Sequence, residues 1–196
     1  MQRLLIGAVA TLGMVVPAAG QTWTIDSNHS AASFAVRHMS VSIIRGEFQT
    51  MTGTVEFDGE DITKALVSVE IDAASVNTRV PRRDAHLRTA DFFDVAKFPK
   101  ITFTSKRIEP AGPGRFRMTG DLTMHGVTKE VVLTGEGPSK PFLDPKGTLF
   151  SGATATGTIN RRDFGMNYGA IFDGAVEIAD QIQLTLDAEL RRKVSP

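Results

Sequence analysis

Cysteine is absent from this chain of 196 residues. Its absence excludes disulfide bonds, thiolate metal sites and cysteine nucleophiles. A net charge is also lacking, because 22 Lys and Arg residues balance 22 Asp and Glu residues. A domain that binds along a phosphate backbone normally carries a basic excess, so we expect no nucleic-acid partner.

Catalytic and metal-binding motifs are missing as well. The chain has no Gly-x-Ser-x-Gly elbow, no phosphate-binding glycine loop and no dinucleotide fingerprint. Its histidines, His29, His38, His86 and His125, lack the close pairing of His-x-His or His-Glu-x-x-His that metal sites use. We therefore expect a protein that is not an enzyme and that binds no metal and no cofactor.

Long apolar runs are confined to the start of the chain. Residues 4–16 form such a run, which follows Gln2-Arg3 and precedes the small residues of Pro17-Ala18-Ala19-Gly20. The run is shorter than the roughly 20 residues of a membrane-spanning helix. This pattern predicts a cleaved secretory signal peptide over 1–20, one domain over 21–196 and no transmembrane segment in the mature chain. Export without cysteine is typical of the bacterial periplasm, which is the predicted location.

Apolar and polar residues alternate along most of the remaining sequence. The clearest run contains Ile182, Leu184, Leu186, Ala188 and Leu190. A period of two turns one face of a strand inward and the other toward water. The pattern predicts an all-β fold of about eight strands, with a short helix over 82–89 and a helical turn near 61–65. Periodicity leaves a two-sheet sandwich and a closed barrel equally open.

Phenylalanine is common at the predicted interior positions, and the chain contains 12 of them. Such rings serve as ordinary core filler or as the lining of an apolar pocket. His38 is in phase with Phe34 and Val36, so its ring is expected to face the interior, where it needs a hydrogen-bond partner. The candidate ligand-binding residues are Phe34, Val36, His38, Phe48, Phe92, Phe93, Phe98, Phe103, Phe116, Met118 and Phe164.

Basic residues gather around the predicted helix. Arg83, His86 and Arg88 are candidates for contact with a polar head group, such as a pyrophosphate or a quinone oxygen. The alternative is a solvated helix on which Asp84 and Arg88, four residues apart, pair with each other. If the first interpretation holds, neutralising Arg83 and Arg88 changes head-group preference and leaves tail affinity nearly intact.

Nine short motifs occur in order along the mature sequence and resemble the YceI-like family, also called the polyisoprenoid-binding family. The resemblance extends from about residue 24 to residue 190. The motifs include Asp26-x-x-His29-Ser30, Phe34-x-Val36-x-His38, Arg45-Gly46-x-Phe48, Arg83-Asp84-x-His86-Leu87-Arg88, Asp91-Phe92-Phe93-Asp94, Gly120-Asp121-Leu122-Thr123 and Asn160-Arg161-x-Asp163-Phe164-Gly165. Residues 168–180 depart from the family pattern, because Ala170, Ile171 and Phe172 interrupt the polar connection expected there. A lid and a contact surface are both open for that segment.

The resemblance implies a lipocalin-like antiparallel barrel, usually exported, whose lumen holds an isoprenoid or similar long-chain amphiphile. A quinone, a polyprenyl phosphate and a fatty-acid derivative all fit this class. Each buried methylene contributes about 0.8 kcal/mol, so a tail can supply the affinity without a charged anchor. The family includes dimers, so the resemblance also allows a homodimer. An envelope protein without bound lipid and an enzyme that acts on a lipid are the alternatives.

Overall fold

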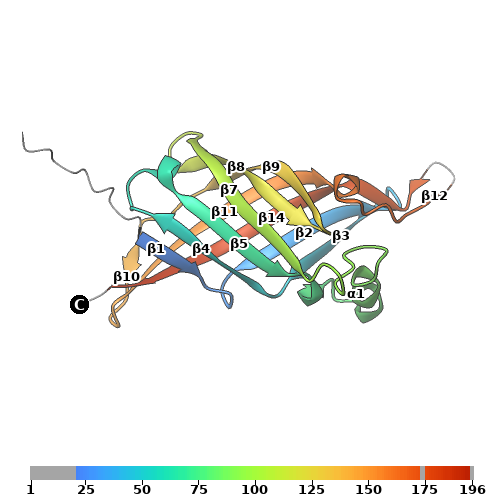
Figure 1. The fold of residues 1–196 in the computed structure, drawn as a ribbon, viewed down its shortest axis with the longest axis horizontal. Coiled ribbons are helices and arrows are strands. Elements are labelled where there is room, and N and C mark those ends of the chain that lie inside the picture. The colour runs from blue at the N-terminus through green and yellow to red at the C-terminus, as the bar shows by residue number, and fades with distance from the viewer. Residues whose placement is uncertain (1–20, 173–174, 195–196) are drawn as a thin grey trace, which may run out of the picture.

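Eight antiparallel strand positions close into a barrel in the part of the chain that the computed structural model describes, residues 21–172 and 175–194 (Figure 1). The predicted signal peptide, 1–20, lies outside these residues. The closed ring confirms the lipocalin-like barrel and excludes the sandwich. Its order is β1 (Gln21–Ile25), β4 (Met51–Phe57), β5 (Leu66–Asp72), β7 (Lys100–Pro110), β8 (Arg115–Met124), β9 (Val127–Glu136), β11 (Thr148–Asn160) and β14 (Ile178–Lys193), and β14 pairs with β1.

Three of the eight positions are each divided into two strands. β2 (Ala31–His38) continues β1 along the same edge of β14. β3 (Ser42–Phe48) pairs with β2 and runs into β4, and the two-residue β6 (Val76–Asn77) pairs with β3 and follows β5. The wall bends at each break. The two strands of a divided position together span a greater length of the barrel than either strand does alone.

β14 is the seam of the barrel. It pairs with β11 from Thr148↔Lys193 to Asn160↔Gln181. Its other edge pairs first with β2 and then with β1. Because both edges are occupied and one face is apolar, the alternation in this segment is the cleanest in the sequence.

Alternation predicts the inward face of β7 correctly up to Ser105, and a bulge reverses the phase beyond it. Ile101 and Phe103 are buried on one side of it, and Ile108 is buried on the other. The register shifts between Ser105 and Arg107. One extra residue in a bulged strand moves the inward positions from odd to even numbers.

The two ends of the barrel differ in structure (Figure 1). The helix end has α1 (Pro81–Leu87) and the hairpin of β12 (Ile171–Phe172) and β13 (Ala175–Val176). The β10 end has β10 (Phe142–Leu143) and the loops 58–61 and 137–141. Three short 3-10 helices complete the fold, namely η1 (Ile62–Lys64), η2 (Ala73–Ser75) and η3 (Arg161–Phe164).

The predicted helical segments are present, although each is shorter than expected. α1 begins at Pro81, whose fixed φ and missing N–H suit the first helical position. The turn expected near 61–65 is η1, which the Asp61 side chain caps by accepting from the Thr63 N–H. None of the helices in the described residues has the length and apolar character needed to cross a membrane.

Candidate functional site: two adjacent chambers

The main chamber is the barrel lumen, with a volume of about 490 Å³. This is within the range of roughly 300–1,000 Å³ that small-molecule sites usually have. Its wall is almost wholly apolar, and its charged residues, Glu60 and Lys140, are exposed at the β10 end. Five of the residues predicted from sequence line this chamber: Phe34, Phe48, Phe103, Phe116 and Met118.

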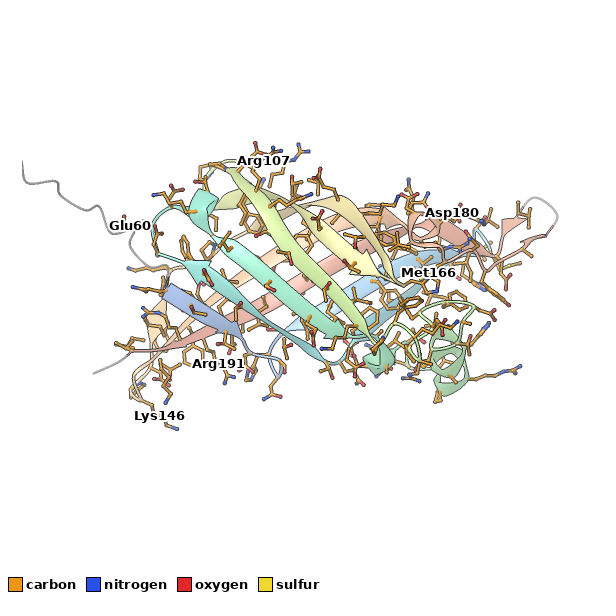
Figure 2. The ribbon with its side chains drawn as sticks, viewed as in Figure 1. Glu60, Arg107, Lys146, Met166, Asp180 and Arg191 are labelled. Atoms are coloured by element: carbon orange, nitrogen blue, oxygen red, sulfur yellow. The ribbon has the colours of Figure 1, made fainter. Side chains whose placement is uncertain are left out.

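A second chamber of about 410 Å³ lies at the helix end. From the predicted set it contains Phe34, Val36, His38, Phe48, Phe92, Phe93, Arg83 and His86. The phase argument for His38 therefore places its ring correctly, on the inner side of the wall. Figure 2 shows how far apart the two chambers reach, because Glu60 of the lumen and Met166 of the second chamber lie toward opposite ends of the molecule.

The two chambers share five lining residues, Phe34, Phe48, Met124, Ile159 and Leu184. The rings of Phe34 and Phe48 have their centroids 5.8 Å apart, and Phe93 stacks edge-on against Phe48 at 5.3 Å. Phe34 and Phe48 lie between the lumen and the second chamber and line both. A long tail that passed these two rings would contact the walls of both chambers.

Glycines explain how so many rings leave the lumen open. Phe34 pairs across the sheet with Gly46, and Phe116 pairs with Gly135. A Cβ atom on either glycine would overlap with the ring of its partner. Each ring therefore lies against the wall on the neighbouring strand and does not project across the cavity.

Phe98 and Phe164 do not line either chamber, which corrects the prediction for both. Phe98 lies against Gly126 and packs edge-on against His125, with centroids 5.0 Å apart. Phe164 is buried where η3 meets the barrel, and its carbonyl oxygen is 2.9 Å from Nδ1 of His125. Both rings serve to attach loops to the barrel, a role that a count of nearby aromatics cannot distinguish from a pocket lining.

Arg88 lines neither chamber, and its guanidinium is engaged with the backbone. Nε donates to the carbonyl of Ala74 at 2.7 Å, and Nη2 donates to the carbonyl of Val76 at 2.8 Å. These two carbonyls belong to η2 and β6, next to the break in the third strand position. Arg88 therefore fastens α1 to the wall. It does not pair with Asp84, so the solvated-helix alternative is wrong for this residue.

Arg83 lines the second chamber but is similarly occupied. Nε donates to Oγ1 of Thr78 at 2.7 Å, and Nη2 donates to the Thr78 carbonyl at 2.8 Å. The buried Asp84 completes this junction by accepting from the N–H and the hydroxyl of Thr78. Two of the three predicted head-group residues thus hold α1 in place, Arg83 near its start and Arg88 at its C-terminal end.

His86 is the third, and it lies at the mouth of the second chamber. Nε2 is 2.8 Å from Oδ2 of Asp91. The imidazole also packs edge-on against Phe92 and Tyr168, with centroid distances of 5.1 Å and 4.9 Å. Tyr168 belongs to residues 168–180, the segment that departs from the family pattern. That segment therefore forms part of the wall of the second chamber.

Arg161 holds that segment in place. The side chain is 2% exposed, and burial lowers the pKa of its guanidinium. Its donors reach the carbonyls of Met166, Ile178 and Ala179 at 2.6–3.2 Å, and Nη2 lies 3.1 Å from Oδ1 of Asp180. Like Arg83 and Arg88, Arg161 donates to backbone carbonyls of this chain, and its role is structural.

A cluster outside the chambers joins the β1–β2 turn to β14. Oδ2 of Asp26 is 2.9 Å from Nδ1 of His29 and 3.1 Å from Nη1 of Arg191. The contact with His29 holds the pKa of Asp26 below its usual value, and the same contact raises the pKa of His29. The ligand atoms of Asp26, His29 and Glu189 lie within 4.8 Å of one another. Arg191 already neutralises the Asp26 carboxylate, so the cluster is built as an ion-pair clamp.

Sequence reasoning missed two residues at the β10 end, Trp23 and Arg192. Trp23 lines the lumen, and its Nε1 is buried without a hydrogen-bond partner among the described residues. Nε of Arg192 is buried and equally without a partner, and Cζ lies 5.3 Å from the centroid of the Trp23 ring. The signal was present, because Arg192 continues the inward phase of Leu186, Ala188 and Leu190.

Comparison with known proteins agrees with this architecture. A UPF0312 protein of Pseudomonas savastanoi pv. phaseolicola (strain 1448A / Race 6) is 36% identical over 167 residues, which is 81% of this chain and 85% of the relative. The YCEI protein of Campylobacter jejuni is 32% identical, with a TM-score of 0.69, 81% of this chain covered and 90% of that one. A polyisoprenoid-binding domain from Saccharophagus degradans shares the fold at 16% identity, with a TM-score of 0.61 over 88% of this chain and 98% of that one.

The family model described as a YceI-like domain matches residues 23–190, which is nearly all of the barrel. Several of the motifs quoted above fall on the walls of the chambers, from the inward face of β2 to the aromatic residues after α1, whereas Asp26-x-x-His29-Ser30 belongs to the ion-pair cluster outside them. The chain belongs to the YceI-like family.

Proposed function

We propose that this protein binds an isoprenoid or another long-chain amphiphile without transforming it, and that it does so after export to the periplasm. The observation that carries the proposal is the apolar lumen of about 490 Å³, which lies next to a second chamber and shares Phe34 and Phe48 of its wall with it. The membership in the YceI-like family supports it, as does the fold shared with a domain described as polyisoprenoid-binding. A quinone, a polyprenyl phosphate and a fatty-acid derivative remain the candidate ligands.

An elongated apolar cavity favours a flexible tail over a compact ligand. A tail can follow the bend in the wall, and each methylene that leaves water contributes about 0.8 kcal/mol. Part of that gain is offset by the cost of ordering the tail. Binding of this kind needs no charged anchor in the lumen, which accounts for the scarcity of polar groups on its wall.

Native mass spectrometry of the protein purified from a bacterial periplasm, followed by organic extraction, tests the proposal. We expect a discrete added mass that leaves as a long-chain lipid of unchanged structure. The variant Phe103→Asp puts a charge on the lumen wall and should abolish lipid retention, at some cost in stability.

Thr104→Asp is the matched control, since Thr104 is the exposed neighbour on the opposite face of β7. It should retain lipid at the wild-type level. A folded wild-type protein that carries no lipid and refuses added prenyl lipids would contradict the proposal. Conversion of the added lipid over time would support the enzymatic alternative.

A further inference from the structure

Two buried N–H groups at the β10 end of the lumen lack a hydrogen-bond partner among the described residues. They are Nε1 of Trp23 and Nε of Arg192. Trp23 is 3% exposed and forms part of the lumen wall. Buried donors are nearly always paired, because each gives up its hydrogen bond to water on folding. An acceptor from outside the described chain would satisfy both groups.

The charges near Arg192 leave its guanidinium uncompensated. The adjacent Arg191 faces the other side of β14 and pairs with Asp26 at 3.1 Å. Arg192 makes no ion pair within residues 21–172 and 175–194. At the rim of the same chamber, the exposed Glu60 and Lys140 carry opposite charges that cancel formally. Arg192 is therefore a cation without an acidic partner among the described residues, held against the Trp23 ring.

We propose that Trp23 and Arg192 bind the anionic head of the amphiphile, a carboxylate or a phosphate, while its tail runs through the lumen toward the helix end. This inference rests on the proposed function, because it requires a tail in the lumen. The contact with the Trp23 ring engages the guanidinium as a cation over the ring face, so its N–H edge stays free to donate. An anionic oxygen suits these donors best, since charge-assisted hydrogen bonds are stronger than neutral ones.

Arg192 lies beyond the part of the chain that the family model matches, which ends at residue 190. The proposed head-group site lies at the opposite end of the barrel from the arginines of α1. The side-chain N–H groups of those arginines already donate to Thr78, Ala74 and Val76. Head-group recognition and helix attachment are thus assigned to different ends of the barrel.

Three ligands that share one tail provide the test: geranylgeranyl phosphate, geranylgeranoic acid and geranylgeraniol. Their affinities are measured on the lipid-free wild-type protein by calorimetry. We expect the phosphate or the acid to bind about tenfold or more tightly than the alcohol, and the ratio between these two identifies which anion the site takes. Arg192→Met should reduce the affinity for the anionic ligands to the level of the alcohol and leave the affinity for the alcohol unchanged.

Two further variants serve as a control and as a second test. Arg191→Met removes the neighbouring charge on the outer face and should leave the preference for the anionic ligands intact. Trp23→Phe keeps a ring against Arg192 but removes the N–H, so it should weaken the binding of the anionic ligands alone.

The Trp23 indole gives a direct readout, because the chain contains a single tryptophan. In an isotope-labelled sample its N–H resonance should move downfield when the anionic ligand binds, and less so with the alcohol. Equal affinity of the wild-type protein for all three ligands, or an unmoved indole resonance, would overturn the inference and leave the proposed function standing. If none of the three binds, the proposed function fails and the inference fails with it.

Discussion

At the helix end, Arg83, Arg88 and Arg161 donate to backbone carbonyls of the loops and strands around them. At the β10 end, Arg192 lies against a tryptophan ring, and its Nε has no partner in the part of the chain that the structure describes. The first group secures irregular chain whose carbonyls have no strand partner. The guanidinium at the other end has no such task. The number of arginines in a region is thus a poor guide to a binding site. Whether each guanidinium N–H already has an acceptor within the protein is a better guide.

The sharpest way to test the structural role of the helix end is to remove Asp84. In Asp84→Ala, the buried N–H and hydroxyl of Thr78 lose their acceptor. We expect a loss of about 3 kcal/mol in the free energy of unfolding, measured by urea denaturation. Asp84→Asn keeps one acceptor oxygen and should lose clearly less. Equal stability of Asp84→Ala and the wild type would remove Asp84 from the junction.

A smaller effect is expected from Arg88→Met, which keeps an unbranched apolar stem and removes both donors. The carbonyls of Ala74 and Val76 lose charged partners, so unfolding should become easier by about 2 kcal/mol. The relative affinities for phosphate, acid and alcohol should stay as in the wild type. Arg82→Met, on the exposed side of the same helix, is the control and should be nearly neutral in both measurements. A changed ligand preference in Arg88→Met would restore the sequence-based assignment of a head group at α1.

The smallest effect concerns pH and the clamp between the β1–β2 turn and β14. The contact with Asp26 raises the pKa of His29 above 6.5, so its stabilisation is fully present below pH 6.5 and is lost as pH rises through the raised pKa. The lowered pKa of Asp26 gives stabilisation that is lost only in acid, as pH falls through that value. The melting temperature should therefore decline slightly as pH rises from 6.5 through the raised pKa of His29. His29→Gln should lack this decline, and an identical decline in the variant would exclude His29 as its source.

The fold was largely predictable because period-two alternation reflects a physical requirement that acts locally. β14 shows it most clearly, and the phase of Leu184 and Leu186 agrees with their place on the lumen wall. The phase of His38 was correct for the same reason. Even the bulge in β7 left Phe103 on the predicted side, since it lies beyond that residue.

The site was less predictable because hydrogen-bond partners come from distant parts of the chain. The carbonyls that occupy Arg88 belong to residues 12 and 14 positions earlier, on a turn that no periodicity describes. Trp23 and Arg192 meet only because β1 and β14 close the ring, and nothing local to either residue indicates the other. Phe98 was misassigned because its position near α1 was visible and its contact with His125 was not.

The seam formed by β14 has a consequence for how the molecule is made. β11, β1 and β2 all use β14 as a pairing partner, and β14 follows every other barrel strand in the chain. A ribosome therefore delivers the closing strand last, and until residues 178–193 emerge, the nascent barrel has two unpaired edges and an open apolar interior. Unpaired strand edges and exposed apolar surface are the features that chaperones bind, and the interior becomes a closed container only when the final strand is inserted.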